Sequence, residues 1–177
     1  MTTFLFVRHG EPDYDSVGSW SRFPFGKDYA GLTERGKRQI EESCRKLADR
    51  KVDIIVSSPY TRTMQGAAIL SRFLGVDVAV ENDLHEWEVD LTHTVTEEKD
   101  FLALCKEHDK YGGIYPDELP RKWESTEMVR RRVWKCLEKY RNCSCVVVSG
   151  HAMMMQAALG IDRAIEYGEI LSASCFV

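Results

Sequence analysis

The sequence predicts an α/β fold, a three-layer α/β/α sandwich with a mostly parallel central sheet. Two short continuous apolar runs, residues 4–7 and 145–148, have the length and composition of strands that are buried on both faces. Segments with the helical spacing of apolar residues alternate with further short apolar runs between them. Because alternating strands and helices build parallel sheets covered by helices, this order favours the sandwich.

Three further strands complete the predicted sheet. Residues 53–57 follow the first helical segment, and residues 76–80 follow the second. Residues 170–177 can form a closing strand at an edge of the sheet. Each run is short and rich in β-branched residues, as expected of strands in a compact domain.

The predicted helices have recognisable start signals. Thr33 and Ser125 can accept a hydrogen bond from a free amide group of the first turn. Pro59 suits the opening of a helix, since the first turn does not need its missing N–H group. A further helix is expected to begin near Thr96, and the last one near Ala152.

The length of 177 residues fits one domain, residues 1–177, in which the less regular residues 91–125 are expected to form a small cap or insert region. The formal net charge of −4 gives no general attraction for nucleic acid or an anionic membrane. No apolar stretch is long enough to span a bilayer. We therefore expect neither partner, and the sequence does not indicate an oligomeric state.

The six cysteines are scattered without a CxxC pair, so we interpret them as free thiols of a reducing cytoplasm rather than as zinc ligands. The one dense basic run, Arg130, Arg131 and Arg132 with Lys135, is interpreted as a solvated helix face. Consecutive positions on a helix point in different directions, which does not favour a binding patch.

Polar side chains follow the ends of several predicted strands. Arg8 and His9 come directly after residues 4–7, and His151 follows residues 145–148. Arg62 lies in the first turn of the helix after the second strand, and Glu86 follows the third strand. Because ligand sites of open α/β sheets lie beyond the carboxyl ends of the strands, we expect these groups to converge. Two guanidinium groups, two imidazoles and a carboxyl group suit a phosphoryl group.

Five segments of the chain carry a resemblance to a known family. They are Arg8-His9-Gly10-Glu11, Gly31-Leu32-Thr33-Glu34-Arg35-Gly36, Ser57-Ser58-Pro59-Tyr60-Thr61-Arg62, Leu84-His85-Glu86 and Ser149-Gly150-His151. With these segments, in this order, the chain resembles the histidine phosphatase superfamily, in its phosphoglycerate-mutase-like branch. The resemblance implies a phosphohistidine mechanism without a metal or other cofactor, on a small phosphorylated substrate. It further implies that His9 is the nucleophile, that Arg8, Arg62 and His151 hold the phosphate oxygens, and that Glu86 is the general acid and base.

Phosphomonoester hydrolysis is the predicted reaction, and a phosphoglycerate-type mutase is the alternative. A mutase must shield its intermediate from water, for which this short chain leaves little lid. Two rivals stay open. His9, His151 and Glu86 could instead bind a catalytic zinc ion, although the adjacent arginines would repel it. The chain could also be a non-catalytic phosphate-binding module.

The loop of residues 12–32 holds the features that the sequence leaves undecided. Asp15 stands where many members of the mutase branch carry an asparagine that donates to phosphate, and a carboxylate cannot do so. We therefore expect Asp15 to turn away or to serve a loop turn. Arg22 and Lys27 could bind a second acidic group of the substrate, and Tyr14 or Trp20 could stack on a ring.

Overall fold

The centre of the molecule is a five-stranded sheet. The computed structural model describes residues 1–17, 25–116 and 118–175. The strand order is β3-β2-β4-β1-β5, in which all neighbouring pairs are parallel except the antiparallel pair of β1 and β5. This confirms the expected mostly parallel sheet and its closing edge strand. The strands are β1 (Thr2–Arg8), β2 (Ile54–Ser57), β3 (Val78–Val80), β4 (Cys145–Gly150) and β5 (Ile170–Cys175).

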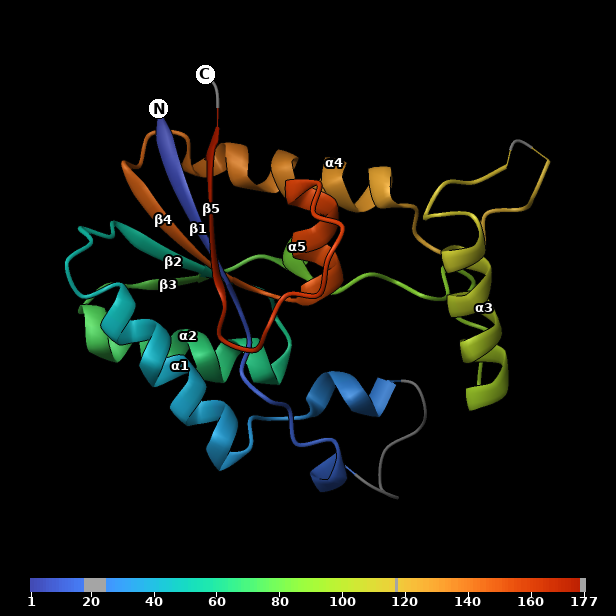
Figure 1. The fold of residues 1–177 in the computed structure, drawn as a ribbon, viewed down its shortest axis with the longest axis horizontal. Helices are drawn as coiled ribbons and strands as arrows, with labels where there is room; N and C mark the ends of the chain where they lie inside the picture. The colour runs from blue at the N-terminus through green and yellow to red at the C-terminus, as the bar shows by residue number, and fades with distance from the viewer. Residues whose placement is uncertain (18–24, 117, 176–177) are drawn as a thin grey trace.

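Helices cover both faces of the sheet and form the predicted three layers (Figure 1). One face packs against α1 and α2, and the other packs against α4 and α5. Short 3-10 turns join several of the elements. The helices are α1 (Glu34–Lys46), α2 (Thr61–Leu74), α3 (Glu98–Lys110), α4 (Thr126–Leu137) and α5 (Ala152–Leu159), and the turns are η1 (Asp15–Val17), η2 (Phe25–Tyr29), η3 (Asn82–Leu84) and η4 (Glu138–Tyr140).

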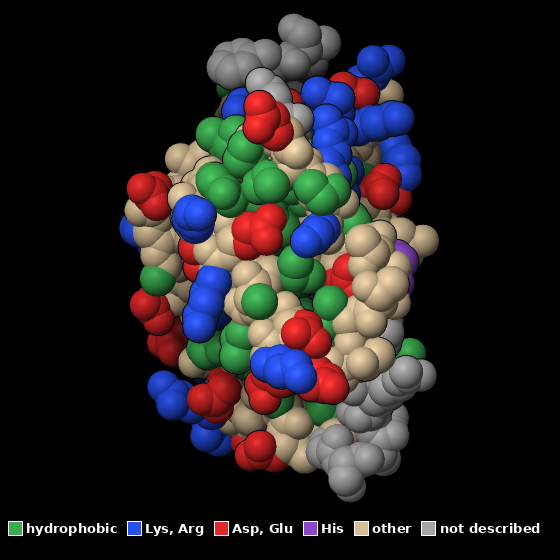
Figure 2. All heavy atoms as spheres, turned by 90° about the vertical axis from the view of Figure 1, so that its right-hand side faces the viewer, with side chains coloured by type: hydrophobic (Ala, Val, Ile, Leu, Met, Phe, Trp, Pro, Cys, Tyr) green, Lys and Arg blue, Asp and Glu red, His purple; other side chains and the backbone are tan. Residues whose placement is uncertain are grey.

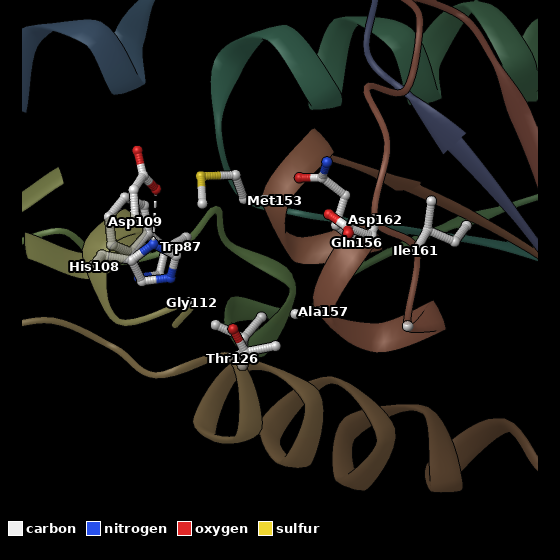
Figure 3. A pocket seen from close by; sticks show the side chains of 12 residues that line it. Trp87, His108, Asp109, Gly112, Thr126, Met153, Gln156, Ala157, Ile161 and Asp162 are labelled. Atoms are coloured by element: carbon white, nitrogen blue, oxygen red, sulfur yellow. Dashed lines mark hydrogen bonds and ion pairs between the residues drawn. The ribbon is translucent and has the colours of Figure 1, made fainter. Parts of the chain in front are cut away.

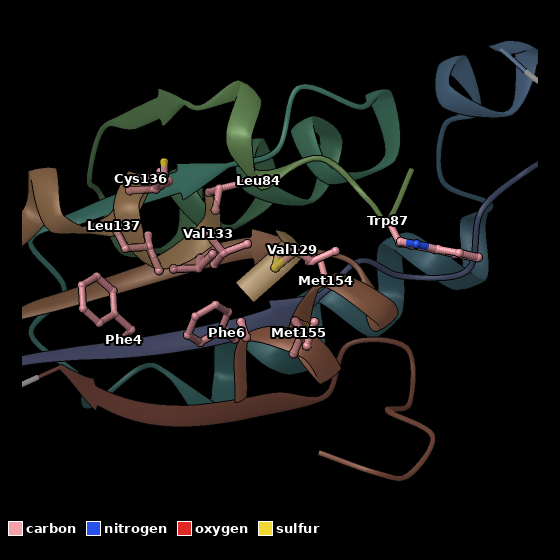
Figure 4. Packing of buried hydrophobic residues seen from close by; sticks show 14 of the residues in the cluster. Phe4, Phe6, Leu84, Trp87, Val129, Val133, Cys136, Leu137, Met154 and Met155 are labelled. Atoms are coloured by element: carbon pink, nitrogen blue, oxygen red, sulfur yellow. The ribbon is translucent and has the colours of Figure 1, made fainter. Parts of the chain in front are cut away.

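Strand β1 is continuously apolar because its side chains enter two cores. Phe4 and Phe6 point to the α4 and α5 side, where each meets the ring of Trp134 edge-on at 5.7 and 6.0 Å between centroids (Figure 4). Leu5 and Val7 enter the core against α1 and α2. Full burial of one such side chain is worth about 1.5–3 kcal/mol. The two cores therefore hold the carboxyl end of β1 firmly in place.

The predicted helix starts are correct at two caps and shifted at two others. The hydroxyl of Thr33 accepts from the amide of Gly36, and that of Ser125 accepts from the amide of Met128, so both caps are confirmed. Helix α2 begins two residues after Pro59, and α3 begins after Glu97 rather than near Thr96. These shifts lie within the usual uncertainty of helix ends.

Helix α3 lies apart from the sheet, at the right of Figure 1. It is attached through aromatic side chains. His108 is on the helix but buried, with its ring centroid 4.2 Å from that of Trp87 and 5.1 Å from that of Trp123. The ring of Trp123 is stacked on that of Tyr115. These packed aromatic rings therefore connect α3 to the segment after η3 that contains Trp87.

The surface around α3 mixes side chains of every kind. Figure 2 shows acidic and basic groups interspersed with hydrophobic ones on this face. Leu102, Ile114 and Leu119 are among the exposed hydrophobic residues. Across the described ranges, no helix combines the length and apolarity needed to cross a bilayer. The five cysteines whose side chains are described are free thiols, of which Cys44 and Cys136 are buried.

Two glycines offer a matched test of how closely α1 approaches the end of β1. A Cβ atom on Gly36 would lie 2.3 Å from the carbonyl oxygen of Glu11, whereas one on Gly66 of α2 would meet nothing closer than 3.7 Å. Gly36→Ala is expected to lower the free energy of unfolding by about 1–3 kcal/mol through overpacking. Gly66→Ala is expected to raise it by about 0.5–1 kcal/mol, because alanine favours the helix. Urea denaturation measures both, and equal stability of the two variants would contradict the close approach.

Candidate active site

The register between β1 and β4 places the two histidines side by side. Arg8 pairs with Gly150, so His9 and His151 are the next residues on the two parallel strands. The amide of His9 donates to the carbonyl of Gly150 at 3.0 Å, which continues the strand pairing by one step. The two imidazole rings are 5.3 Å apart between centroids and inclined at 66°. The structure thus brings together two predicted site residues from opposite ends of the sequence.

The hydrogen bonds of His9 define which ring nitrogen carries its proton. Nδ1 lies 2.7 Å from the carbonyl oxygen of Gly10, and because a carbonyl only accepts, Nδ1 must donate. Nε of Arg62 lies 3.3 Å from Nε2 of His9 and donates to it. Burial of the ring, then the charge of Arg62, lowers the pKa of His9 from 6.5 to about 3. His9 is therefore a neutral imidazole with a lone pair on Nε2.

His151 is completely buried and is held by one hydroxyl group. Its Nε2 lies 2.7 Å from Oγ of Ser58, while its Nδ1 has no hydrogen-bond partner among the described residues. Burial and the charge of Arg62 lower its pKa well below 6.5. If the hydroxyl of Ser58 donates to Nε2, the proton of the neutral ring is on Nδ1. His151 then has a free N–H donor in the site.

The two arginines are fixed in different ways. Arg8 donates to the carbonyl of Ile165, and its guanidinium carbon lies 4.0 Å from the centre of the Tyr167 ring. Nε of Arg8 is buried and has no partner among the described residues. Arg62 donates from Nη1 to the carbonyl of Lys27 at 3.0 Å. Both cations are therefore held in place before any ligand binds, and Arg8 keeps an unused donor.

Glu86 lies at the amino end of α5. Its Oε1 accepts hydrogen bonds at 2.9 Å from the amides of Trp87 and Met154, and the amide of Met153 lies 3.4 Å from Oε2. The start of a helix offers free N–H groups and a positive dipole, so it suits a carboxylate. Oε1 is thus occupied by short hydrogen bonds, whereas Oε2 accepts only a long one. Oε2 is the oxygen that stays available for proton exchange.

A buried ion pair holds the backbone before and at Glu86. Nε and Nη2 of Arg132 lie 2.6 and 2.9 Å from the carboxylate oxygens of Glu124, and both side chains are at most 14% exposed. The same guanidinium group donates to the backbone carbonyls of Asp83, His85 and Glu86. The interpretation of the basic run as a solvated face is therefore wrong for Arg132, which faces inward, although Arg130 and Arg131 are exposed. Consecutive residues on a helix point in different directions, so one arginine of such a run can face the neighbouring segments while the others stay exposed.

A cavity of 330 Å³ opens beside these groups. Its lining includes Arg62, Glu86 and Tyr60, and it extends to Phe101 and Cys105 of α3. A second cavity of 410 Å³ lies between His108, the start of α4 and the residues around Asp162 (Figure 3). None of the described residues that line this second cavity is lysine or arginine. The first cavity therefore has the cation that a phosphorylated ligand requires, and the second has none in its described lining.

The remaining predicted residues lie around the site. Asp15 is exposed at the start of η1, as expected of a residue that turns away. Glu11 accepts from the hydroxyl of Thr33 at 2.7 Å and therefore ties the end of β1 to α1. Trp20 and Arg22 are outside the described residues. In the part of the chain that the structure describes, no group of three or more His, Cys, Asp or Glu side chains could hold a metal ion.

Comparison with known proteins identifies the family. The family model described as "Histidine phosphatase superfamily (branch 1)" matches residues 4–169. The chain belongs to this superfamily. It is similar to "Phosphoserine phosphatase 1" of Hydrogenobacter thermophilus, with 31% identity over 92% of this chain and 78% of that one. It is also similar to "Probable phosphoglycerate mutase" of Photorhabdus laumondii, with 27% identity over 80% of this chain and 64% of that one.

Solved structures of the superfamily share the fold. The structure of a mycobacterial glucosyl-3-phosphoglycerate phosphatase superposes with a TM-score of 0.70, covering 97% of this chain and 89% of that one. Its sequence identity is 18%, so the likeness concerns the fold. The predicted phosphoglycerate-mutase-like sandwich is therefore confirmed.

Several residues of the candidate site cannot be assigned a role from the sequence. Ser58 lies in one of the segments that match the superfamily, and Tyr167 lies outside all of them. Both are recognised only through contacts with residues far away in the sequence, His151 and Arg8. The ion pair of Arg132 and Glu124 cannot be recognised in the sequence either. Arg132 lies on an ordinary amphipathic helix, and Glu124 is the residue directly before the cap of that helix.

The ion pair at Arg132 gives a sharp stability prediction. Glu124→Gln leaves a guanidinium group that is mostly buried without its counter-charge. Removing one partner of a buried pair typically costs about 3–5 kcal/mol, and we expect a loss of that order in the free energy of unfolding. Urea denaturation measures the loss.

Arg131→Met is the matched control for this variant. Arg131 pairs with Glu127 at 3.7 Å, but the two side chains are 78% and 66% exposed. Its removal should change the free energy of unfolding by less than about 1 kcal/mol. Equal losses in Glu124→Gln and Arg131→Met would show that the buried pair does not hold the Glu86 segment.

Proposed function

We propose that the protein is a metal-independent phosphomonoester hydrolase that acts through a covalent phosphohistidine on His9. The observation that carries this proposal is the neutral imidazole of His9, with its lone pair on Nε2 next to Arg62. A buried neutral nitrogen is a competent nucleophile at neutral pH, and the adjacent cations offer charge stabilisation for a phosphoryl group. Membership of the histidine phosphatase superfamily agrees with this chemistry.

In the first step, Nε2 of His9 attacks phosphorus in line with the leaving oxygen. The bond from phosphorus to nitrogen forms as the bond from phosphorus to the leaving oxygen breaks, and Glu86 gives its proton to that oxygen. Arg62 exchanges its hydrogen bond to Nε2 for one to a phosphate oxygen. Nε of Arg8 and Nδ1 of His151, which have no partner among the described residues, donate to other phosphate oxygens.

In the second step, water attacks the phosphohistidine. Glu86, now ionised, takes a proton from the water, and the electron pair of the bond between phosphorus and nitrogen returns to Nε2. Orthophosphate leaves, and both His9 and Glu86 regain their starting states. Dividing the reaction into two displacements is the advantage of a covalent route.

The substrate in this proposal is a small phosphorylated metabolite. The cavity of 330 Å³ has the size of a small-molecule site. The names of the relatives, a phosphoserine phosphatase and a glucosyl-3-phosphoglycerate phosphatase, support this class of substrate. The free cysteines fit a reducing compartment, and we place the enzyme in the cytoplasm on that basis.

A mutase is the second candidate, supported by the similarity to a protein named as a phosphoglycerate mutase. The two activities have different products from the same compound. Incubation with 3-phosphoglycerate releases phosphate if the enzyme is a hydrolase and yields the 2-phospho isomer if it is a mutase. Isomer formation without phosphate release would reject hydrolysis.

Hydrolysis of para-nitrophenyl phosphate after treatment with a chelator tests the proposal. We expect turnover without metal, no turnover in His9→Ala, and a fall in kcat of about 10²–10³ in Arg62→Ala, since one charge-stabilising donor is lost. Arg72→Ala is the control, because Arg72 is an exposed arginine in the last turn of the same helix.

Three outcomes would contradict the proposal. Loss of activity on chelation would favour the zinc alternative. Turnover by His9→Ala at the parent rate would remove His9 from the chemistry. Phosphate-dependent thermal stabilisation without turnover of any phosphomonoester would instead support a non-catalytic binding module.

A further inference from the structure

The cavity beside Arg62 and Glu86 holds more acidic than basic side chains. Among the described residues of its lining, the acids are Asp28, Glu86, Glu88 and Asp90, and the basic side chains are Lys27, Arg62 and His93. In the proposed reaction, Arg62 binds the phosphate and Glu86 serves the leaving oxygen. The rest of the substrate must therefore lie among the remaining charges.

Asp90 can be set aside, because its carboxylate is already used by the backbone. One oxygen accepts from the amide and the hydroxyl of Thr92, and the other accepts from the amides of Thr94 and Val95 at 2.8 Å. These bonds shape the turn after Asp90 and lower the pKa of its carboxyl group. The charges that a ligand meets are those of Asp28, Glu88 and Lys27.

Glu88 and Asp28 come from different segments. Glu88 follows the catalytic segment, is 34% exposed, and lies 3.5 Å from Nδ1 of the exposed residue His93. Asp28 is in η2 and lines the same cavity as the 86–88 segment. Lys27 has its ammonium group 5.9 Å from the centre of the Tyr14 ring. Two carboxylates and one ammonium group therefore line this part of the cavity, so the acidic groups outnumber the basic one.

The ionisation of Asp28 reflects this imbalance. Burial raises the pKa of its carboxyl group to about 6, and although Arg62 lowers the pKa, the carboxylates of Glu88 and Glu86 raise it further. A cation bound beside Asp28 would relieve the repulsion between these acids. A second anion would increase it.

We propose that the leaving group of the substrate is an amino alcohol, whose protonated amine binds between the carboxylates of Asp28 and Glu88. The proposal rests on the proposed function and extends it to substrate class. The aromatic side chains Tyr14, Tyr60 and Phe101 in the same lining also favour an ammonium group, because a cation is attracted to the face of a ring. The ammonium group of Lys27 repels a basic leaving group, but the two carboxylates outnumber it and favour one.

Three phosphomonoesters with the same two-carbon frame test the proposal. O-phosphoethanolamine has a cationic leaving group, 2-hydroxyethyl phosphate a neutral one, and phosphoglycolate an anionic one. We expect kcat/KM to fall in that order, by about tenfold or more between the first and the last, because a unit charge a few ångströms from a carboxylate is strongly attracted or repelled. Para-nitrophenyl phosphate is measured in parallel as a general substrate.

The double variant Asp28→Asn with Glu88→Gln tests the residues. We expect the ratio of kcat/KM for phosphoethanolamine to that for phosphoglycolate to drop at least about tenfold, since both carboxylates are replaced by neutral amides of the same shape. Glu41→Gln on the exposed face of α1 is the control and should leave the ratio unchanged. Using a ratio makes the result independent of the fraction of folded enzyme.

Each outcome has a distinct meaning. Equal kcat/KM for the three esters, a preference for phosphoglycolate, or turnover of para-nitrophenyl phosphate alone would overturn the amine proposal while leaving the hydrolase proposal standing. An unchanged ratio in the double variant would also overturn it. Absence of turnover on all four esters would reject the proposed hydrolase, and the amine proposal with it.

Discussion

Parallel hydrogen bonding between β1 and β4 determines where the two histidines of the site lie. The pairing of Arg8 with Gly150 leaves His9 and His151 as neighbours at the strand ends. A slip of this register by one residue would turn one histidine toward the opposite face of the sheet. The register is secured by the alternation of Phe4 and Phe6 with Leu5 and Val7 between the two cores. The apolar pattern of one strand is thus directly linked to the placement of the proposed nucleophile.

The proposed acid and base group is positioned by a separate set of contacts. Glu86 is not part of a strand, and it lies at the amino end of α5 because the amides of that helix bind its carboxylate. The ion pair of Arg132 with Glu124 fixes the carbonyl groups before and at Glu86. The sheet holds the proposed nucleophile His9, and α4 holds the segment of the proposed acid Glu86, so the two halves of the site depend on different parts of the core.

The sequence was sufficient to predict the groups whose positions follow from strand order. His9, His151 and Arg62 lie at strand or helix ends, and the rule that parallel strands end at one edge predicts their convergence. Ser58 and Tyr167 could not be found in this way, because their roles depend on side-chain contacts between distant segments. For Arg132, the helical period alone does not say which of three consecutive arginines faces inward. The acidic side of the cavity also depends on tertiary structure, since Asp28 and Glu88 are brought together only by the fold.

The central claim is that the neutral Nε2 of His9 becomes phosphorylated. Rapid acid-free quenching of the enzyme during turnover of a radiolabelled phosphomonoester, followed by peptide mapping, tests it most directly. We expect the label on the peptide that contains His9. It should be stable to base and labile to acid, and it should be missing in His9→Ala. A burst of product without any protein-bound label, or a label that maps to Glu86 or His151, would contradict it.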